Sequence, residues 1–303
     1  MTRVPTAGRA ATSPGPPPAP RADPSHRPDL GAAPSTRPCA SARWRAIRAL
    51  VVRDLAGRHP LRPPLLLDLG FGLVNLVVFL VISRLLAPDP GFAGSPSYFD
   101  FVAAGLVFML VLQAASTQLT ARISREQRAG TLEMLVAQPV PAWALALGLT
   151  GYPMLFALLR VAVYLTVLAL FLGLDTGDAS WIGVTVVLVA ACAAMAGVGI
   201  ALMAVTVLTG HGDAAARLLV VALSFVSGTY FPVTVLPAGL ERVSAALPTR
   251  VALDGLRAAL AGDGWARPAG TLLVAAAVSL PVSGWLFDLA LRTARRRGGL
   301  TRG

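Results

Sequence analysis

Residues 180–208 read SWIGVTVVLVAACAAMAGVGIALMAVTVL, and this stretch decides the fold of the chain. It carries no charged side chain, and it is longer than the roughly 20 apolar residues that a helix needs to cross about 30 Å of hydrocarbon. Small residues recur in it, as is typical of a helix face that packs closely against another helix. They are Ala190, Ala193, Ala194, Gly197 and Ala201. The stretch therefore predicts a membrane-spanning helix inside a helical bundle.

Five other apolar runs have a sufficient length to cross a bilayer. They cover about residues 65–86, 100–120, 145–173, 217–236 and 269–291. The whole chain is 55% hydrophobic and only 14% charged, with a mean hydropathy of +0.67. Soluble domains carry roughly a quarter of charged residues. The sequence therefore predicts an all-α membrane protein with six transmembrane helices.

The distribution of arginine orients these helices. All 26 basic residues of the chain are arginines, and the formal net charge is +11. With the N-terminus inside, 20 arginines lie in cytoplasmic parts and five in external parts, which are Arg84, Arg242, Arg250, Arg257 and Arg267. Positive charge collects on the cytoplasmic side, so we expect both termini in the cytoplasm. No signal-peptide core precedes the first span, which favours the same orientation. Because the arginines flank apolar runs, the expected partner is membrane lipid and not nucleic acid.

The segments outside the spans differ in composition. Residues 1–40 contain ten prolines and no apolar run, which predicts a disordered cytoplasmic tail. Residues 41–60 alternate apolar residues and arginines at helical spacing, which predicts an amphipathic interfacial helix or, alternatively, a soluble helix packed on a partner. The membrane domain then covers residues 61–292, and residues 293–303 form a basic cytoplasmic tail. Arginine in place of lysine, with abundant alanine, glycine and proline, suggests a bacterial genome and thus a bacterial plasma membrane.

The sequence contains no clear catalytic or cofactor-binding motif. A phosphate-binding Walker A loop needs a lysine, and the chain has none. ATP-derived work must therefore come from another subunit. Cys39 and Cys192 lie in different environments and predict no disulfide framework. The histidines His26, His59 and His211 are isolated, so we expect no metal site and no cofactor in this chain.

Residues 122–139, RISREQRAGTLEMLVAQP, form the only sizeable charged loop between apolar runs. Ser124 and Gln127 have the spacing of a capping box, which can start a short helix. Gly130 interrupts that helix, Thr131 can cap a second short turn, and Pro139 limits it. The prediction is a compact helix–turn unit that docks a partner; an ordinary solvated loop is the alternative. The side chains offering both signs of charge are Arg125, Glu126, Arg128 and Glu133.

Polar residues inside the second and fifth spans are candidates for a translocation path, because polar side chains in hydrocarbon tend to face protein or water. Hydrogen bonding between helices explains them equally well. Pro232 removes a helical hydrogen bond and should kink or end the fifth span. The candidates are Gln113, Ser116, Thr117, Gln118, Ser224, Ser227, Thr229 and Tyr230.

Arg160 lies near the middle of the third span, where an arginine costs about 2.5–3.5 kcal/mol on insertion scales. This cost places it in a bundle interior, in a water-filled cavity or in a snorkelled pose. It either faces an anionic group in a cavity or is satisfied by backbone carbonyls or a neighbouring carboxylate.

The external segment 237–268 has apolar residues at helical spacing on both sides of Pro248. Two short helices can dip into the outer leaflet and return, provided that protein shields any irregular backbone. A helical loop lying flat outside the membrane is the alternative.

Three motifs together resemble those of type-2 ABC exporter permeases. The run REQRAGTLE at 125–133, with Leu135 and Pro139, resembles the first cytoplasmic loop of that family. The runs SGTYFPVTVLP at 227–237 and LPTRVALDGLR at 247–257 match two further family motifs. The resemblance extends over about residues 45–297. Gln138 departs from it, because the family usually has Thr or Ser there, and the tail 1–40 lies outside the pattern.

This resemblance implies a permease subunit that pairs with a second permease copy, as a homodimer or heterodimer, and with two ATPase subunits that bind ATP and Mg²⁺. The loop with Glu126, Gly130 and Glu133 would contain the coupling helix seated in an ATPase groove. The segment after Pro237, including Pro248 and Arg257, would be an external re-entrant hairpin. Relatives export drugs, antibiotics or polysaccharide-type compounds, so we expect export of an amphipathic small molecule or a lipid-linked substrate.

Other classes of membrane protein remain open on the residues alone. A secondary transporter usually shows internal repeats and paired intramembrane acids, and neither is visible here. An intramembrane protease needs a nucleophile and a base at membrane depth, and His211 at a span end is the sole candidate base. A membrane scaffold without transport activity would not need the break at Gly130.

Overall fold

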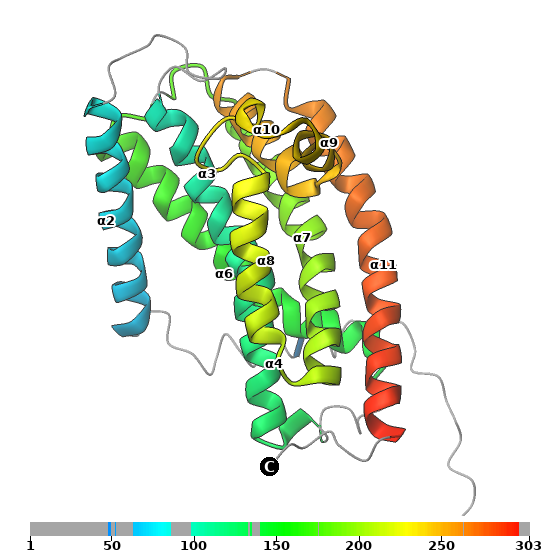
Figure 1. Ribbon diagram of the computed structural model, residues 1–303. Coiled ribbons are helices and arrows are strands. Elements are labelled where there is room, and N and C mark those ends of the chain that lie inside the picture. Colours follow the sequence, from blue (N-terminus) through cyan, green and yellow to red (C-terminus); the bar gives the residue numbers. More distant parts are fainter. Residues whose placement is uncertain are drawn as a thin grey trace, which may run out of the picture. The chain divides into compact units, whose positions relative to one another are not determined.

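A computed structural model describes a bundle of helices (Figure 1). The described residues are 48–49, 52, 63–85, 98–132, 134, 140–174, 176–262 and 264–296. Within these ranges, all regular elements are helical. They are α2 (Pro63–Leu85), α3 (Tyr98–Gln113), the π-helical turn η1 (Ala114–Gln118), α4 (Leu119–Arg128), α6 (Ala142–Phe171), α7 (Trp181–Thr209), α8 (Gly212–Val226), the 3₁₀ turn η2 (Val233–Val235), α9 (Ala238–Ala246), α10 (Pro248–Leu260) and α11 (Ala266–Arg296). The prediction of an all-α protein is confirmed for this part of the chain.

Four helices of the described part are long and apolar enough to cross a membrane. One is the continuous rod of α3, η1 and α4 from Tyr98 to Arg128, and the others are α6, α7 and α11. They correspond to the predicted second, third, fourth and sixth spans. Within α2, residues Gly70–Arg84 form a shorter apolar helix at the position of the predicted first span.

Helix α7 is the central element, and its most extensive partner is α11. The two helices approach closely because Gly197 has no side chain: a Cβ at this position would lie 2.3 Å from the Ser279 hydroxyl of α11. That hydroxyl donates a 3.5 Å hydrogen bond to the carbonyl of Ala194. The small-residue face predicted within 180–208 is therefore a helix-packing face.

The predicted fifth span, 217–236, has different bounds in the structure, because α8 ends at Val226. Gly228 has a positive φ of 78° and ends the helix in a Schellman motif. The Gly228 amide bonds the Phe225 carbonyl, and the Thr229 amide bonds the Ser224 carbonyl. The prediction that Pro232 ends or kinks this span was wrong: Gly228 ends it, and Pro232 precedes η2.

The two ends of the bundle have different partners. At one end, α4 contacts α6, α7 and α8. At the other end, far from α4, α10 contacts α3 and α7, and α9 contacts α8 and α10 (Figure 1). The amide of Ser180 donates a 2.9 Å hydrogen bond to the carbonyl of Ala259 there. As predicted, the segment after Pro237 forms two short helices separated at Pro248, which is the first residue of α10.

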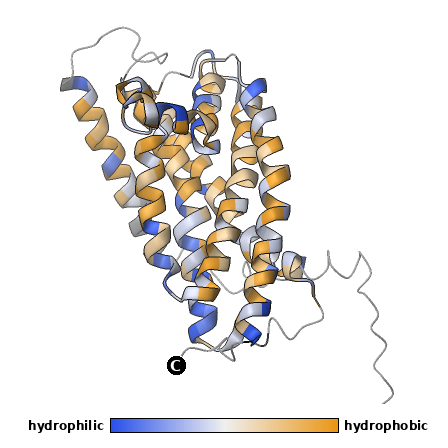
Figure 2. Cartoon of the chain, turned by 45° about the vertical axis from the view of Figure 1, so that its right-hand side comes forward, coloured by the Kyte–Doolittle hydropathy of each residue, from blue (hydrophilic) through white to orange (hydrophobic). Residues whose placement is uncertain are grey.

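Apolar residues predominate along the long helices (Figure 2). Phe71, Phe171, Ile182 and Val274 are among the exposed large hydrophobic residues, as expected of helices that face lipid. The predicted tail 1–40 lies outside the described residues. Of the predicted interfacial helix 41–60, only Arg48, Ala49 and Val52 are described, and they are helical. Of the predicted basic tail 293–303, residues 293–296 form the end of α11, and the others lie outside the described residues.

Candidate functional site

The charged loop after the second span begins as a continuation of that span. Helix α4 runs without interruption from η1 to Arg128, so Ser124 and Gln127 lie inside a helix and not at its start. The predicted capping box was wrong, because the amides near Ser124 already have intrahelical partners. The helix ends where predicted: Gly130 has a φ of 68°, and its amide bonds the Gln127 carbonyl at 3.2 Å. We call the segment from Arg125 to Leu132 the elbow.

Three polar side chains attach α4 to three other helices. Arg122 is only 5% exposed, and its guanidinium donates a 2.9 Å hydrogen bond to the Leu149 carbonyl of α6. The Ser124 hydroxyl donates to the Asp213 carboxylate of α8 at 3.4 Å. The Gln127 amide donates to the Val207 carbonyl of α7 at 3.5 Å. These contacts join α4, which continues into the elbow, to α6, α7 and α8.

The sequence analysis missed this attachment because it placed these residues in a loop. One signal was available: Ile123 is apolar, lies in the middle of the charged stretch and is fully buried. An apolar residue there indicates that one face of the stretch packs on the bundle.

The exposed surface of the elbow is basic. Arg125 and Arg128 are exposed, and the Arg125 guanidinium donates to the carbonyl of Ala121. Glu126 is half-buried, and its carboxylate accepts a hydrogen bond from the Thr131 hydroxyl. The Thr131 hydroxyl thus bonds back to the end of α4. Thr131 and Leu132 are themselves helical. Glu133 and Pro139, the other two predicted coupling residues, lie outside the described residues.

A cavity of about 120 Å³ lies between α2, α3, α6 and the segment after α8. It contains three of the predicted path residues, which are Gln113, Arg160 and Tyr230. Arg160 is 5% exposed, so its charge is held inside the bundle, as the insertion cost requires. The cavity also contains Asn75 and Tyr164, which the sequence analysis did not select. Asn75 carried a signal, because it is a polar residue within an apolar run.

The other predicted path residues lie elsewhere. Ser116 is fully buried in η1, and the Thr117 hydroxyl bonds the Gln113 carbonyl of its own helix at 2.9 Å. The Ser224 hydroxyl bonds the Val221 carbonyl within α8. Ser227 pairs with Thr249 at the start of α10. Pro232, before η2, is not among the residues that line the cavity.

Arg257 fastens α10 to the bundle. Its guanidinium donates to the carbonyls of Phe101 at 3.2 Å and Gly228 at 2.9 Å, and it lies 3.6 Å from the centroid of the Phe101 ring. Burial lowers the pKa of Arg257 to about 10, against an opposing effect of Asp254. The guanidinium therefore keeps its charge at neutral pH, and α10 stays attached to α3 and to the end of α8.

The described residues offer no metal-binding site, because no three His, Cys, Asp or Glu side chains among them lie close enough together to hold an ion. The features that these residues do form are the elbow, the cavity with Arg160 and the attachment of α10 by Arg257.

The family comparison agrees with this arrangement. The model of the ABC-2 type transporter family matches residues 54–261, which is more than half of the chain. The match includes the elbow, the cavity residues and the external helices α9 and α10. A comparison with curated protein sequences found no match. The chain therefore belongs to the ABC-2 type transporter family and is a multi-pass membrane protein, the permease component of an ABC transporter.

Proposed function

We propose that this protein is the permease subunit of an ATP-driven exporter in a bacterial plasma membrane. It crosses the membrane six times with both termini in the cytoplasm, and it pairs with a second permease copy. Two separate ATPase subunits bind ATP and Mg²⁺ and dock on the elbow. The transported compound is an amphipathic small molecule or a lipid-linked substrate that moves outward.

The observation that carries this proposal is the attachment of α4, which continues into the elbow, to three helices through Arg122, Ser124 and Gln127. A docking loop that merely tethers a partner needs no buried contacts with the spans. An elbow that drives transport needs a stiff connection, because a push on a loose segment dissipates in local motion. Helices α6, α7 and α8 receive the push directly, and α3 receives it through the rod.

Orientation follows from the charge at each end. The elbow end carries Arg125, Arg128, Arg217, Arg292, Arg295 and Arg296. The elbow end also carries Glu126, Asp213 and Asp288, while the other end carries Arg242, Arg250, Arg257 and Arg267 together with Asp100, Asp178, Glu241 and Asp254. The positive-inside rule therefore favours a cytoplasmic elbow, where an ATPase has access to it.

The cavity with Arg160 and Tyr230 is the proposed start of the substrate path. Its polar groups can hydrogen-bond a polar part of the substrate, while the surrounding helices accommodate an apolar part. The external helices, with Pro237, Pro248 and Arg257, form the proposed re-entrant hairpin at the exit.

Charge reversal tests ATPase docking. The double variant Arg125→Glu with Arg128→Glu should reduce co-purification of the partner ATPase by about tenfold, because like charges across an interface cost several kcal/mol. The matched control is Arg242→Glu with Arg267→Glu, two exposed arginines at the opposite end. Equal co-purification of the two double variants would exclude the elbow as the docking site.

A further inference from the structure

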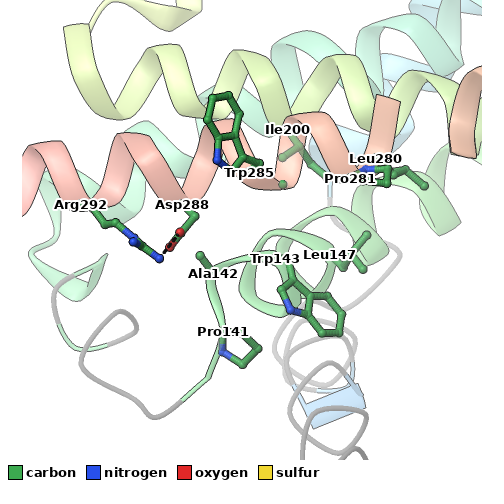
Figure 3. Close-up of a pocket in the computed structure, with 11 residues that line it drawn as sticks. Pro141, Ala142, Trp143, Leu147, Ile200, Leu280, Pro281, Trp285, Asp288 and Arg292 are labelled. Carbon is green, nitrogen blue, oxygen red and sulfur yellow. Dashed lines mark ion pairs between the residues drawn. The ribbon is translucent and has the colours of Figure 1, made fainter. Parts of the chain in front are cut away.

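A second, larger hollow lies at the elbow end of the bundle. It has a volume of about 720 Å³ and lies between the start of α6, α7 and the last third of α11 (Figure 3). We call it the α6–α11 groove. Pockets of about 300–1,000 Å³ typically hold small organic ligands. The cavity with Arg160 shares none of the residues that line this groove.

The groove is apolar along one part and charged at its end. Trp143 and Leu147 of α6 line the apolar part together with Leu280 and Trp285 of α11 (Figure 3). Asp288 and Arg292 follow on the same face of α11, one and two turns after Trp285. At 1.5 Å per residue, Leu280 and Arg292 are separated by about 18 Å along the helix. This gradient suits an amphiphile with one apolar and one charged part.

The two tryptophans indicate the depth of the groove in the membrane. Trp143 and Trp285 are both exposed on the surface of the bundle. Tryptophan is enriched where hydrocarbon meets the headgroups, because its ring is largely apolar but has a polar N–H group. The apolar part of the groove is therefore at the level of acyl chains, and its charged end is at the level of headgroups.

The charged end has an excess of positive charge. Arg292 forms a 2.6 Å ion pair with Asp288, yet its side chain is 71% exposed. Arg295 and Arg296 lie in the last turn of the same helix. Basic pockets between transmembrane helices on the cytoplasmic side complement anionic headgroups, and guanidinium matches the geometry of phosphate oxygens.

We propose that the α6–α11 groove binds an anionic phospholipid from the cytoplasmic leaflet. The acyl chain lies between α6 and α11, and the phosphate contacts Arg292. Asp288 orients the guanidinium and also weakens its attraction for the phosphate. The inference rests on the proposed function only for the orientation of the chain, since lipid binding itself requires neither ATPase nor substrate.

Lipid retention tests this proposal. The full-length protein is reconstituted in nanodiscs of equal parts phosphatidylglycerol and phosphatidylethanolamine and then extracted in mild detergent. Mass spectrometry measures each lipid that stays bound per protein. Arg292→Gln should lower retained phosphatidylglycerol about fivefold, which is the usual contribution of one arginine near an anionic surface. The matched control Arg217→Gln, an exposed arginine at the same end of the bundle, should leave it unchanged.

Two further variants separate binding from a purely structural role. Asp288→Asn should raise retained phosphatidylglycerol about twofold, because an exposed ion pair is worth a few tenths of a kcal/mol to 1 kcal/mol. Gly284 is buried in the groove wall, and a Cβ there would be 3.5 Å from that of Trp143. Gly284→Leu should therefore fill the groove and displace both lipids, while Gly284→Ala should retain them.

We expect Arg292→Gln to lower retained phosphatidylglycerol and Asp288→Asn to raise it, and this difference in direction decides between lipid binding and a purely structural role. If the ion pair only stabilises α11, both variants lower retention, and the proposal is overturned. Equal retention of the two lipids by the unaltered protein excludes selection of an anionic headgroup. A cross-link between copies through Leu280→Cys would show that a second copy occupies the groove instead. ATPase co-purification is recorded for each variant, so failure of lipid binding and failure of ATPase docking are seen separately.

Discussion

Arg122 shows how a single residue connects the elbow to the spans. Its guanidinium lies inside the bundle and donates to the Leu149 carbonyl at 2.9 Å. Hydrogen bonds from a charged group contribute about 1.5–3 kcal/mol, and a buried carbonyl left without a partner is costly. Arg125, three residues later, is exposed and bonds only within its own helix among the contacts described above. These two arginines belong to one charged stretch but have different roles.

We predict that Arg122→Ala destabilises the protein, while Arg125→Ala changes stability by less than about 0.5 kcal/mol. The expected loss for Arg122→Ala is about 1.5–3 kcal/mol, because the Leu149 carbonyl loses its donor. Apparent melting temperatures in detergent measure both variants. Equal melting temperatures would contradict the assigned role of Arg122.

Residue chemistry alone identified part of the cavity. Gln113, Arg160 and Tyr230 were selected because polar groups are rare in apolar runs, and the structure places all three at one cavity. Ser224 and Ser227 were selected by the same reasoning, but their hydroxyls bond Val221 and Thr249. A sequence shows that a side chain is polar, whereas only the fold shows which partner it has.

At the scale of elements, the helices were predicted well and their ends poorly. Apolar length sufficed to locate α6, α7 and α11, because the bilayer sets the minimum length. The end of α8 was misassigned because Pro232 seemed the stronger break, although Gly228 supplies the left-handed conformation that a Schellman motif uses. The start of α4 was misassigned because Ser124 and Gln127 fit a capping-box spacing that occurs by chance inside a longer helix.

Gly130 offers a test at the end of α4. Its φ of 68° is disfavoured for residues with a Cβ, at a cost of roughly 1–2 kcal/mol. We predict that Gly130→Ala lowers co-purification of the ATPase. Asn adopts this conformation more readily than other residues with a Cβ, so Gly130→Asn should restore part of the loss. Identical results for Ala and Asn would show that backbone conformation is not the cause.

The close approach of α7 to η1 leads to a second prediction at the scale of elements. A Cβ on Gly199 of α7 would lie 2.2 Å from the Ala115 carbonyl oxygen in η1. Gly199→Ala should therefore separate α7 from η1 and destabilise the protein by about 1–3 kcal/mol. Gly270→Ala is the matched control, because Gly270 is an exposed helical residue with open space around its Cβ position. Melting temperatures in detergent should fall for the first variant alone.

At the scale of the whole molecule, the two ends of the bundle are chemically distinct. The elbow, the α6–α11 groove and most exposed arginines of the described part lie at one end, and α9 and α10 lie at the other. The six spans were predicted from the lengths of the apolar runs, and their orientation was predicted from the distribution of arginines. Which end of the bundle faces the cytoplasm is a prediction that cysteine labelling can test directly.

We predict that a cysteine in place of Gly239 of α9 reacts with a membrane-impermeant maleimide in intact cells. A cysteine in place of Ala214 of α8 should react only after the membrane is permeabilised. Both positions are exposed. The background is a variant with Cys39→Ser and Cys192→Ala, since Cys192 is buried and free. The reverse labelling pattern would place the elbow outside the cell and exclude a cytoplasmic ATPase as its partner.

The π-helical turn η1 gives the rod from Tyr98 to Arg128 a further property. Its five residues, Ala114–Gln118, follow i→i+5 bonding and are packed by α6, α7 and α8. One surplus residue in a turn rotates everything beyond it by about 100° relative to a regular α-helix. Migration of that surplus by one turn would rotate only the residues of the turn that it passes, while the rod keeps its length and both of its ends keep their orientation. A rod of this build can therefore present a different set of side chains to α6, α7 and α8 at one turn without any displacement of α4.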